Sequence, residues 1–448
     1  MRRRSIALAG ACWLALAGVA VAQADKPAGT PEKDPFDRFK DIPLTTDGAV
    51  TLSLGGQVRI RPEFSRHPVF GLAAPDHNNG LLIRSFLSAD LRLGPYLRAF
   101  VEVVSGQAPI WAGTPPGTQL DRLDLRQGYG ELNLPVTAGS LMVRGGRQEM
   151  SFGSSRLISV RDSPNIRRAF DGVRAAWIAA PDTRIDAFLV RPVVPLAGLF
   201  DDKSDPAQLF WGVYGTSPVP GTHGLKADLY YLGLNRENAR FAQGTADEHR
   251  HTVGARLFGK AGGFDWNLEG AYQFGDFGRA DIQAWMASAV VGYSFADLPF
   301  APRLGLNADA FSGDRNLGDG KLGTFNPLFP RLPYFSEANL VGPANLMNIQ
   351  PNITLSLLPK VKLTVGWNPL WKQEKADAYY GPAITPVART AGGAGRYLGH
   401  QLSTTLEWSP TEHLTLGGTY VAYEPGERVS RAGGVSGSFT AGWATLAF

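Results

Sequence analysis

Long segments in which apolar and polar residues alternate constrain this sequence more than any other feature. From Met347 to Leu357 every second residue is apolar or proline, and the residues between are Asn, Gln, Thr or Ser. Successive side chains of a β-strand point to opposite faces, so each such segment has one apolar and one polar face. We count 18 of these segments, mostly 10 to 14 residues long. Strands of soluble sandwiches usually have about 5 to 6 residues, whereas tilted membrane strands need about 9 to 11.

The connections between these segments alternate between short and long. Gly94-Pro95 and Pro359 are short connections, whereas those at 150–169, 235–247 and 313–345 are long. Short periplasmic turns and long external loops are typical of outer-membrane barrels. The pattern predicts an all-β fold, an 18-stranded antiparallel transmembrane β-barrel of the outer membrane formed by residues 49–448, with both termini in the periplasm.

The last of the alternating segments does not fit one phase. Phe439 and Trp443 alternate in one register, whereas Leu446 and the terminal Phe448 alternate in the other. A β-bulge or a shift of one residue in the segment boundary would explain the difference, and the sequence does not decide between them.

The N-terminus has the pattern of a secretory signal peptide. Three arginines precede an apolar run, Ile6 to Ala22, and an Ala-Gln-Ala cleavage motif ends at Ala24. We predict a signal peptide at 1–24 and a polar, disordered periplasmic leader at 25–48, which would place the mature chain in the cell outer membrane. A membrane anchor is the disfavoured alternative, because glycines interrupt the run. Cys12 is the only cysteine, so the mature chain would have neither disulfides nor cysteine metal ligands.

Charge is balanced overall but unevenly distributed. Removal of the signal peptide leaves 41 basic against 40 acidic residues, which gives nucleic-acid binding no support. Between Asp41 and Asp202 there is no Lys, whereas Arg59 to Arg191 contains 17 Arg and 12 acidic residues. Arginine offers planar donors that suit carboxylate and phosphate groups, although GC-rich codon usage would produce the same bias.

Alternation places the arginines of this half on the polar face of the strands. Val58 and Ile60 are predicted to face lipid, so Arg59 faces the lumen. An arginine at the lipid midplane of a barrel costs about 2 to 4 kcal/mol, so the lumen is its favourable place whatever its role. The residues that alternation predicts along the substrate path are Arg59, Arg61, Glu63, Arg84, Asp90, Arg92, Arg98, Glu102, Arg144, Gln148, Arg174 and Arg303.

Two interpretations of this lumen remain open. Rings of arginine select for anions in pores, which favours a channel for anionic solutes. Alternatively, the acidic residues neutralise the arginines, and the network only stiffens the wall.

The segment 142–171 is the most highly charged part of the sequence. We predict that it folds into the pore and narrows it, with a solvated external loop as the alternative. The candidate residues for this constriction are Arg156, Arg161, Asp162, Asn165, Arg167, Arg168 and Asp171.

The run RGGRQEMSFGSSRLISVRDSPNIRRAFDGVR at 144–174 resembles the core motif of the alginate export family of outer-membrane proteins. The segments GGQVRIRPEF and LDLRQGYGEL are similar to family positions as well, so the resemblance covers nearly the whole mature chain. It implies an 18-stranded barrel with an arginine-lined lumen that passes an anionic polysaccharide such as alginate, or other anionic solutes, by passive transport. It also assigns Arg59, Arg61, Arg144 and Arg147 to the conduit. A general anion-selective porin for small solutes is the alternative.

A structural barrel and an outer-membrane enzyme are the rival classes. None of the seven histidines lies in a recognisable nucleophile motif, so we predict no catalytic residues and no cofactor. We also predict no metal site, because His249 and His251 are more simply polar residues at a strand end. The expected partners are outer-membrane lipid and lipopolysaccharide, an anionic solute or polyuronate, and periplasmic export proteins.

Overall fold

The computed structural model describes residues 34–73, 75–393 and 395–448. The predicted signal peptide and residues 25–33 of the leader lie outside the described residues. Residues 34–40 belong to a separate unit and contain one short 3-10 helix, η1 (Asp37–Phe39). The second unit begins at Asp41, and its strand β1 (Ile42–Pro43) pairs with β2 (Val50–Arg66). The last part of the predicted leader is therefore hydrogen-bonded to the barrel.

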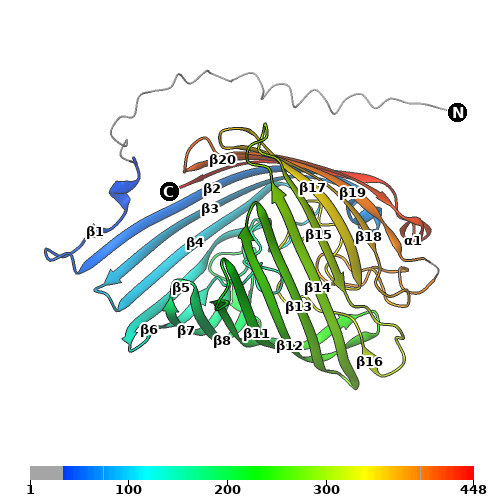
Figure 1. Ribbon diagram of the computed structural model, residues 1–448, viewed down its shortest axis with the longest axis horizontal. Coiled ribbons are helices and arrows are strands. Elements are labelled where there is room, and N and C mark those ends of the chain that lie inside the picture. The colour runs from blue at the N-terminus through cyan, green and yellow to red at the C-terminus, as the bar shows by residue number, and fades with distance from the viewer. Residues whose placement is uncertain (1–33, 74, 394) are drawn as a thin grey trace. The chain divides into compact units, whose positions relative to one another are not determined.

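The second unit is a closed antiparallel β-barrel of 18 long strands (Figure 1), so this prediction is confirmed. Neighbours along the chain pair with one another, and the sheet closes where β2 pairs with β21 (Gly437–Ala447). The other long strands are β3 (His77–Leu93), β4 (Leu97–Ile110), β5 (Asp121–Val136), β6 (Gly139–Gln148), β7 (Phe170–Ala180), β8 (Thr183–Val194), β10 (Gln208–Pro218), β11 (Leu225–Phe241), β12 (Gly244–Ala261), β13 (Phe264–Phe277), β14 (Ala280–Ser294), β15 (Arg303–Phe311), β17 (Leu346–Leu358), β18 (Val361–Trp371), β19 (Tyr397–Trp408) and β20 (Leu414–Pro425).

Short elements decorate the ends of these strands. Two-residue strands extend the sheet at β9 (Lys203–Ser204) and β16 (Lys321–Leu322), which pair with β8 and β14. The 3-10 helix η2 (Pro68–Gly71) follows β2, and the helix α1 (Glu427–Arg431) follows β20. Among the described residues, no helix combines the length and apolar character needed to cross a membrane.

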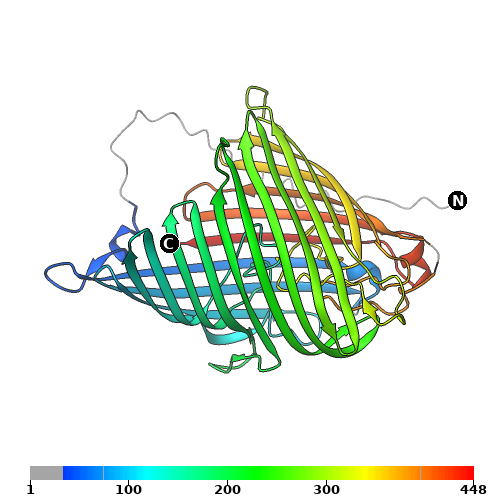
Figure 2. The same cartoon turned by 60° about the horizontal axis from the view of Figure 1, so that its bottom comes forward.

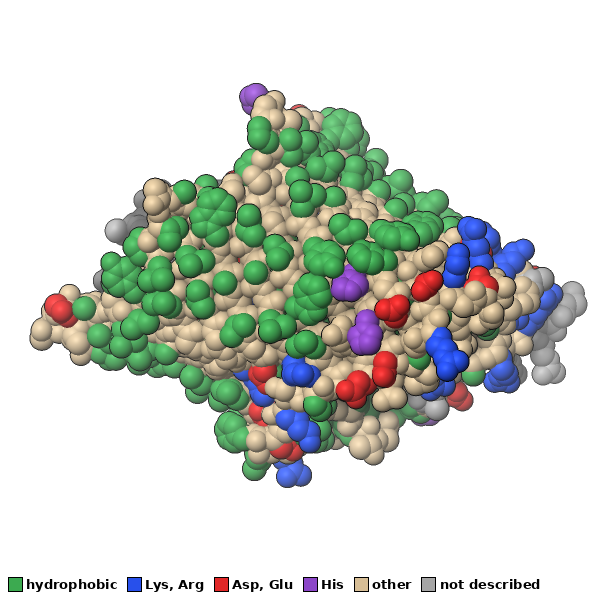
Figure 3. Space-filling view, turned by 90° about the horizontal axis from the view of Figure 1, so that it is seen from below, with side chains coloured by type: hydrophobic (Ala, Val, Ile, Leu, Met, Phe, Trp, Pro, Cys, Tyr) green, Lys and Arg blue, Asp and Glu red, His purple; other side chains and the backbone are tan. Residues whose placement is uncertain are grey.

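The outer face of the barrel is apolar, as alternation predicts. Val58 and Ile60 on β2 are 44% and 48% exposed, whereas Arg59 between them is 5% exposed. Figure 2 shows the long tilted strands of the wall, and Figure 3 shows hydrophobic side chains over most of the wall in view, with charged side chains beyond one end of this band. Lipid rather than water is the favourable surrounding for such a surface.

The last strand contains no bulge. Its register with β2 is continuous from Gln57 opposite Ala447 to Arg66 opposite Ser438. Phe439 is buried and faces the interior, whereas Leu446 is 46% exposed on the lipid side. The two registers of the sequence are therefore the two faces of one regular strand, and the explanation by a bulge or a boundary shift is wrong.

Apolar side chains also fill part of the barrel interior. Phe188 and Phe210 on the wall strands pack in one buried cluster with Phe152 and Ile158 from the loop 149–169 and Phe329 from the loop 312–345. The long loop expected at 235–247 does not form, because β11 and β12 continue to a tight turn at 242–243. Side chains of the loops 149–169 and 312–345 therefore fill part of the barrel interior.

Candidate functional site

The loop 149–169 is bound to one wall of the barrel by two lumenal arginines. The guanidinium of Arg59 donates to the backbone oxygen of Asp162 at 2.8 Å, and that of Arg84 lies 3.0 Å from the Asp162 carboxylate. Arg59 and Arg84 are only 5% and 1% exposed. Both lie on the inner face of the wall, where they hold the loop and are buried from solvent.

An asparagine fixes the same part of the loop through backbone oxygens. The Asn165 side-chain amide donates to the carbonyl oxygens of Ile83, Gln107 and Gln119 at 3.0 to 3.1 Å. Asn165 is fully buried, so these bonds are shielded from water. The loop segment around Asn165 is therefore joined to β3, to β4 and to the connection before β5.

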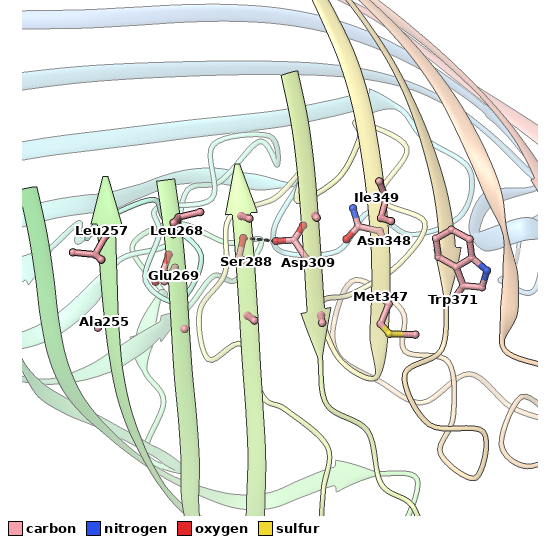
Figure 4. A pocket seen from close by; sticks show the side chains of 15 residues that line it. Ala255, Leu257, Leu268, Glu269, Ser288, Asp309, Met347, Asn348, Ile349 and Trp371 are labelled. Carbon is pink, nitrogen blue, oxygen red and sulfur yellow. Dashed lines mark hydrogen bonds between the residues drawn. The ribbon is translucent and has the colours of Figure 1, made fainter. Parts of the chain in front are cut away.

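The opposite wall holds the other part of the loop. Arg156 forms an ion pair of 2.8 Å with Glu269 on β13, and its Nε lies 3.9 Å from the Asp309 carboxylate on β15. Figure 4 shows Glu269 and Asp309 on the wall, with the hydrogen bond that Ser288 donates to Asp309 between neighbouring strands. Since β13 is ten strands along the 18-stranded sheet from β2, the loop 149–169 crosses the lumen.

A second loop, 312–345, lies against the first. The backbone N–H of Phe329 donates to the oxygen of Leu157 at 2.9 Å, and Ile158 and Phe329 form a parallel β-bridge. Glu337 of the second loop binds Arg61 on β2 at 2.7 Å. The sequence predicts a long connection at 313–345 but not its entry into the barrel. The Phe and Tyr residues of this connection were a signal that it would pack inside rather than remain in solvent.

Most other predicted lumenal residues occupy the inner wall in charge pairs. Glu63 binds Arg61, and Glu102 accepts a hydrogen bond from Gln127. Gln148 is buried on this face, whereas the Arg92 side chain is 59% exposed and lies 3.7 Å from Asp90. Four further predicted residues form wall pairs at 2.5 to 2.8 Å: Arg98 with Asp90, Arg144 with Glu131, Arg174 with Asp186 and Arg303 with Asp265.

Arg147 and Asp171 are not in the lumen. They lie opposite each other on the faces of β6 and β7 that carry the exposed Val143 and Val173, and they form an ion pair of 2.8 Å. Ser204, from the connection that follows β8, donates to the Asp171 carboxylate. Arg147, which the family resemblance assigned to the conduit, and Asp171, predicted as a residue of the constriction loop, lie instead on strands that place them on the outer face of the sheet.

Asp162 and Arg167 balance each other within the crossing loop. Their side chains form an ion pair of 2.5 Å, and Arg84 adds a second positive charge beside Asp162. Although burial opposes the effect, the charges of Arg84 and Arg167 hold the pKa of Asp162 below its usual range. This pair contributes little net charge to the lumen.

Arg161 and Arg168 differ from the arginines above because, among the described residues, their side chains have neither an ion pair nor a hydrogen bond, whereas Arg59 at least donates to backbone oxygens. Within the described part of the chain, neither side chain forms an ion pair, and the Arg161 Nε and Arg168 Nη1 are buried without a hydrogen-bond partner. Burial, followed by repulsion from Arg126, lowers the pKa of Arg161, and burial with repulsion from Arg161 lowers that of Arg168. The Arg168 guanidinium also lies 5.0 Å from the ring centroid of Phe329. Both residues remain partly accessible, so together they form an uncompensated positive site on the crossing loop.

Comparisons with known proteins agree with this architecture. A family model described as alginate export matches residues 50–442. The crystal structure of OccD3 (OpdP) from Pseudomonas aeruginosa is 14% identical, with a TM-score of 0.62, and the match covers 89% of this chain and 91% of that chain. OpdK from the same organism, crystallised with vanillate, is 10% identical with a TM-score of 0.56, over 88% and 98%. OccAB2 from Acinetobacter baumannii is 9% identical with a TM-score of 0.59, over 89% and 98%. None of the curated protein sequences matches.

Proposed function

Since the chain belongs to the alginate export family of outer-membrane channels, we propose that it passes anionic solutes by diffusion through an arginine-bearing constriction. Family and fold indicate a transport channel rather than an enzyme, in agreement with the sequence analysis. We further propose that residues 1–24 are a cleaved signal peptide. Sequencing the N-terminus of protein purified from outer membranes tests this cleavage.

The observation that carries the anion preference is the uncompensated pair Arg161 and Arg168. A guanidinium remains protonated at all physiological pH values, so the lowered pKa of each residue reflects an unfavourable environment rather than loss of charge. An anion beside them would supply the missing counter-charge. In a narrow region of reduced dielectric, this attraction is stronger than in bulk water.

The cargo that fits this site carries carboxylate groups. Guanidinium groups bind carboxylates through paired, charge-assisted hydrogen bonds, and a polyuronate such as alginate presents one carboxylate on each sugar. We therefore propose an anionic polysaccharide as the first candidate. Small carboxylates are the second, because two loops cross the lumen and reduce the space for a polymer.

Conductance in planar lipid bilayers tests the proposal. In a salt gradient, the reversal potential of the purified channel should show preference for anions over cations. Preference for cations would contradict the anion path. Block by oligouronates at concentrations where acetate has no effect would favour the polysaccharide, whereas equal block by small carboxylates would favour the second candidate.

A further inference from the structure

A cluster of aspartates lies where the start of β5 meets the loop between β8 and β10. Asp124, Asp201 and Asp202 each place a carboxylate oxygen within 4.8 Å of the other two. The loop runs beside β5, since Leu199 forms a parallel bridge with Leu123, whose oxygen accepts a 2.9 Å hydrogen bond from the next loop residue. Ionised carboxylates at this spacing repel one another, and a cation or a proton among them removes the repulsion.

A fourth aspartate gives a second observation beside this spacing. Asp121, the first residue of β5, is fully buried, and neither of its carboxylate oxygens has a hydrogen-bond partner. The neighbouring charges that act on it most strongly are those of Asp202 and Asp124, both negative. The Asp202 Oδ2 is also buried without a partner. Burying unpaired carboxylates is strongly unfavourable, so these oxygens indicate a missing ligand.

The nearby arginines do not supply that ligand. Arg147 lies 3.5 Å from Asp124, but its closer ion pair is with Asp171 at 2.8 Å. Arg126 is paired with Glu149 at 3.3 Å. Neither arginine forms a hydrogen bond with the carboxylate oxygens of Asp121. Asp121 and Asp202 therefore have no cationic ion-pair partner among the described residues.

We propose that Asp121, Asp124, Asp201 and Asp202 form a calcium site that fastens the loop 195–202 to β5. Ca²⁺ takes six to eight oxygen ligands in flexible geometry, and carboxylates with water suit it. Mg²⁺ demands a stricter octahedron and keeps more of its water, and Zn²⁺ prefers nitrogen or sulfur ligands. The proposed ligands include no residue of the loop 149–169, so Ca²⁺ binding can be tested apart from the proposed anion path.

A matched pair of variants distinguishes the site from general surface charge. Asp201 and Asp319 are both exposed loop aspartates, and each accepts a hydrogen bond from one backbone N–H, that of Gly198 or Lys321. Asp201→Asn and Asp319→Asn each remove one negative charge and retain an oxygen acceptor. Titration calorimetry with CaCl₂ on chelator-treated, detergent-solubilised protein measures the binding, and circular dichroism checks that each barrel is folded.

We expect the unmodified protein and Asp319→Asn to bind one Ca²⁺ with a Kd of roughly 10⁻⁴ to 10⁻³ M or tighter, as in extracellular calcium modules. Asp201→Asn should bind about tenfold more weakly, because a ligand charge is lost. The absence of Ca²⁺ binding by the unmodified protein would overturn the proposal, as would equal affinities of the two variants. In the unmodified protein, CaCl₂ should also slow proteolysis within 195–206 more than MgCl₂ does. Equal cleavage rates with CaCl₂ and with chelator would equally overturn it.

Discussion

Charges on the barrel strands and charges on the inward loops have different surroundings. On the strands, Arg144 lies directly opposite Glu131 and binds it, and Arg303 binds Asp265. Facing residues of neighbouring strands hold their Cβ atoms about 4.5 to 5.5 Å apart, which allows opposite charges to meet. On the loop 149–169, Arg161 and Arg168 have no such partner among the described residues.

This difference shows that the number of arginines on the wall is a poor guide to the charge that a solute meets. One alternative inferred from the sequence was that acidic residues neutralise the arginines, and this is what the strands of the wall show. The anion path, inferred as the other alternative, is the one that we propose for the loop. The selective residues are therefore expected on the segment that crosses the lumen, and the wall mainly holds that segment in place.

The largest expected loss of stability follows from removing Arg156, a loop arginine that forms a buried ion pair, as the arginines of the wall do. Arg156 and Glu269 are 3% and 4% exposed in their side chains. Arg156→Met should lower the free energy of unfolding by about 3 to 5 kcal/mol, because it leaves a buried carboxylate unpaired. Urea unfolding of the detergent-folded barrel measures this change.

The control for this variant is Arg92→Met. The Arg92 side chain is 59% exposed and lies 3.7 Å from Asp90, so its loss should cost less than about 1 kcal/mol. Similar losses in the two variants would show that the crossing loop is not held by the buried pair.

A smaller effect is expected where the loop is held by neutral hydrogen bonds. Asn165→Ala removes the amide that binds three backbone oxygens, at a cost of about 1 to 3 kcal/mol. The loop should open more often, so proteolysis within 149–169 should accelerate roughly tenfold or more. Asn316→Ala, at an exposed loop position, is the control. Unchanged cleavage in Asn165→Ala would contradict this anchoring role.

The smallest expected change in stability concerns Asp314, a buried acidic residue of the loop 312–345. It tests whether this loop also contains an acidic group without a positive partner. Burial and the nearby Asp377 raise the pKa of Asp314 to about 6, although a backbone hydrogen bond from Asn316 opposes them. The folded state therefore holds this proton more tightly than the unfolded chain, and the contribution of Asp314 to stability increases as the pH falls through 6. Asp314→Asn should stabilise the protein at pH 7 and remove this dependence between about pH 6 and 4. Unfolding temperatures measured across that range check it, and identical pH profiles would refute it.

The strands could be predicted from the sequence because side chains that face lipid are apolar and recur at every second position. The interior follows no such rule, since Phe188 and Phe210 face inward where the loops pack against them. The turn at 242–243 was hidden because polar residues continue both strands beyond the membrane band. Arg147 directly precedes the predicted lumenal residue Gln148, so alternation alone would have placed it on the outer face. It was assigned to the conduit only because of the resemblance to the family.

The candidate site was predictable in place but not in detail. The density of charge in 149–169 indicated the segment, and all its candidate residues except Asp171 belong to the crossing loop. Which arginines are free depends on contacts far apart in the sequence. Arg84 meets Asp162, and Arg156 meets Glu269, whereas Arg161 and Arg168 meet no acid in the described residues.

The reversal potential of two charge-altered channels tests the central claim most directly. Arg161→Gln with Arg168→Gln removes the uncompensated charge, whereas Arg303→Gln with Asp265→Asn removes one balanced wall pair. The first variant should lose anion preference by roughly tenfold, as the loss of an attraction of about 1.4 kcal/mol would produce, and the second should retain it. Unchanged selectivity in the first variant, or an equal loss in both, would contradict the assignment of anion selectivity to the crossing loop.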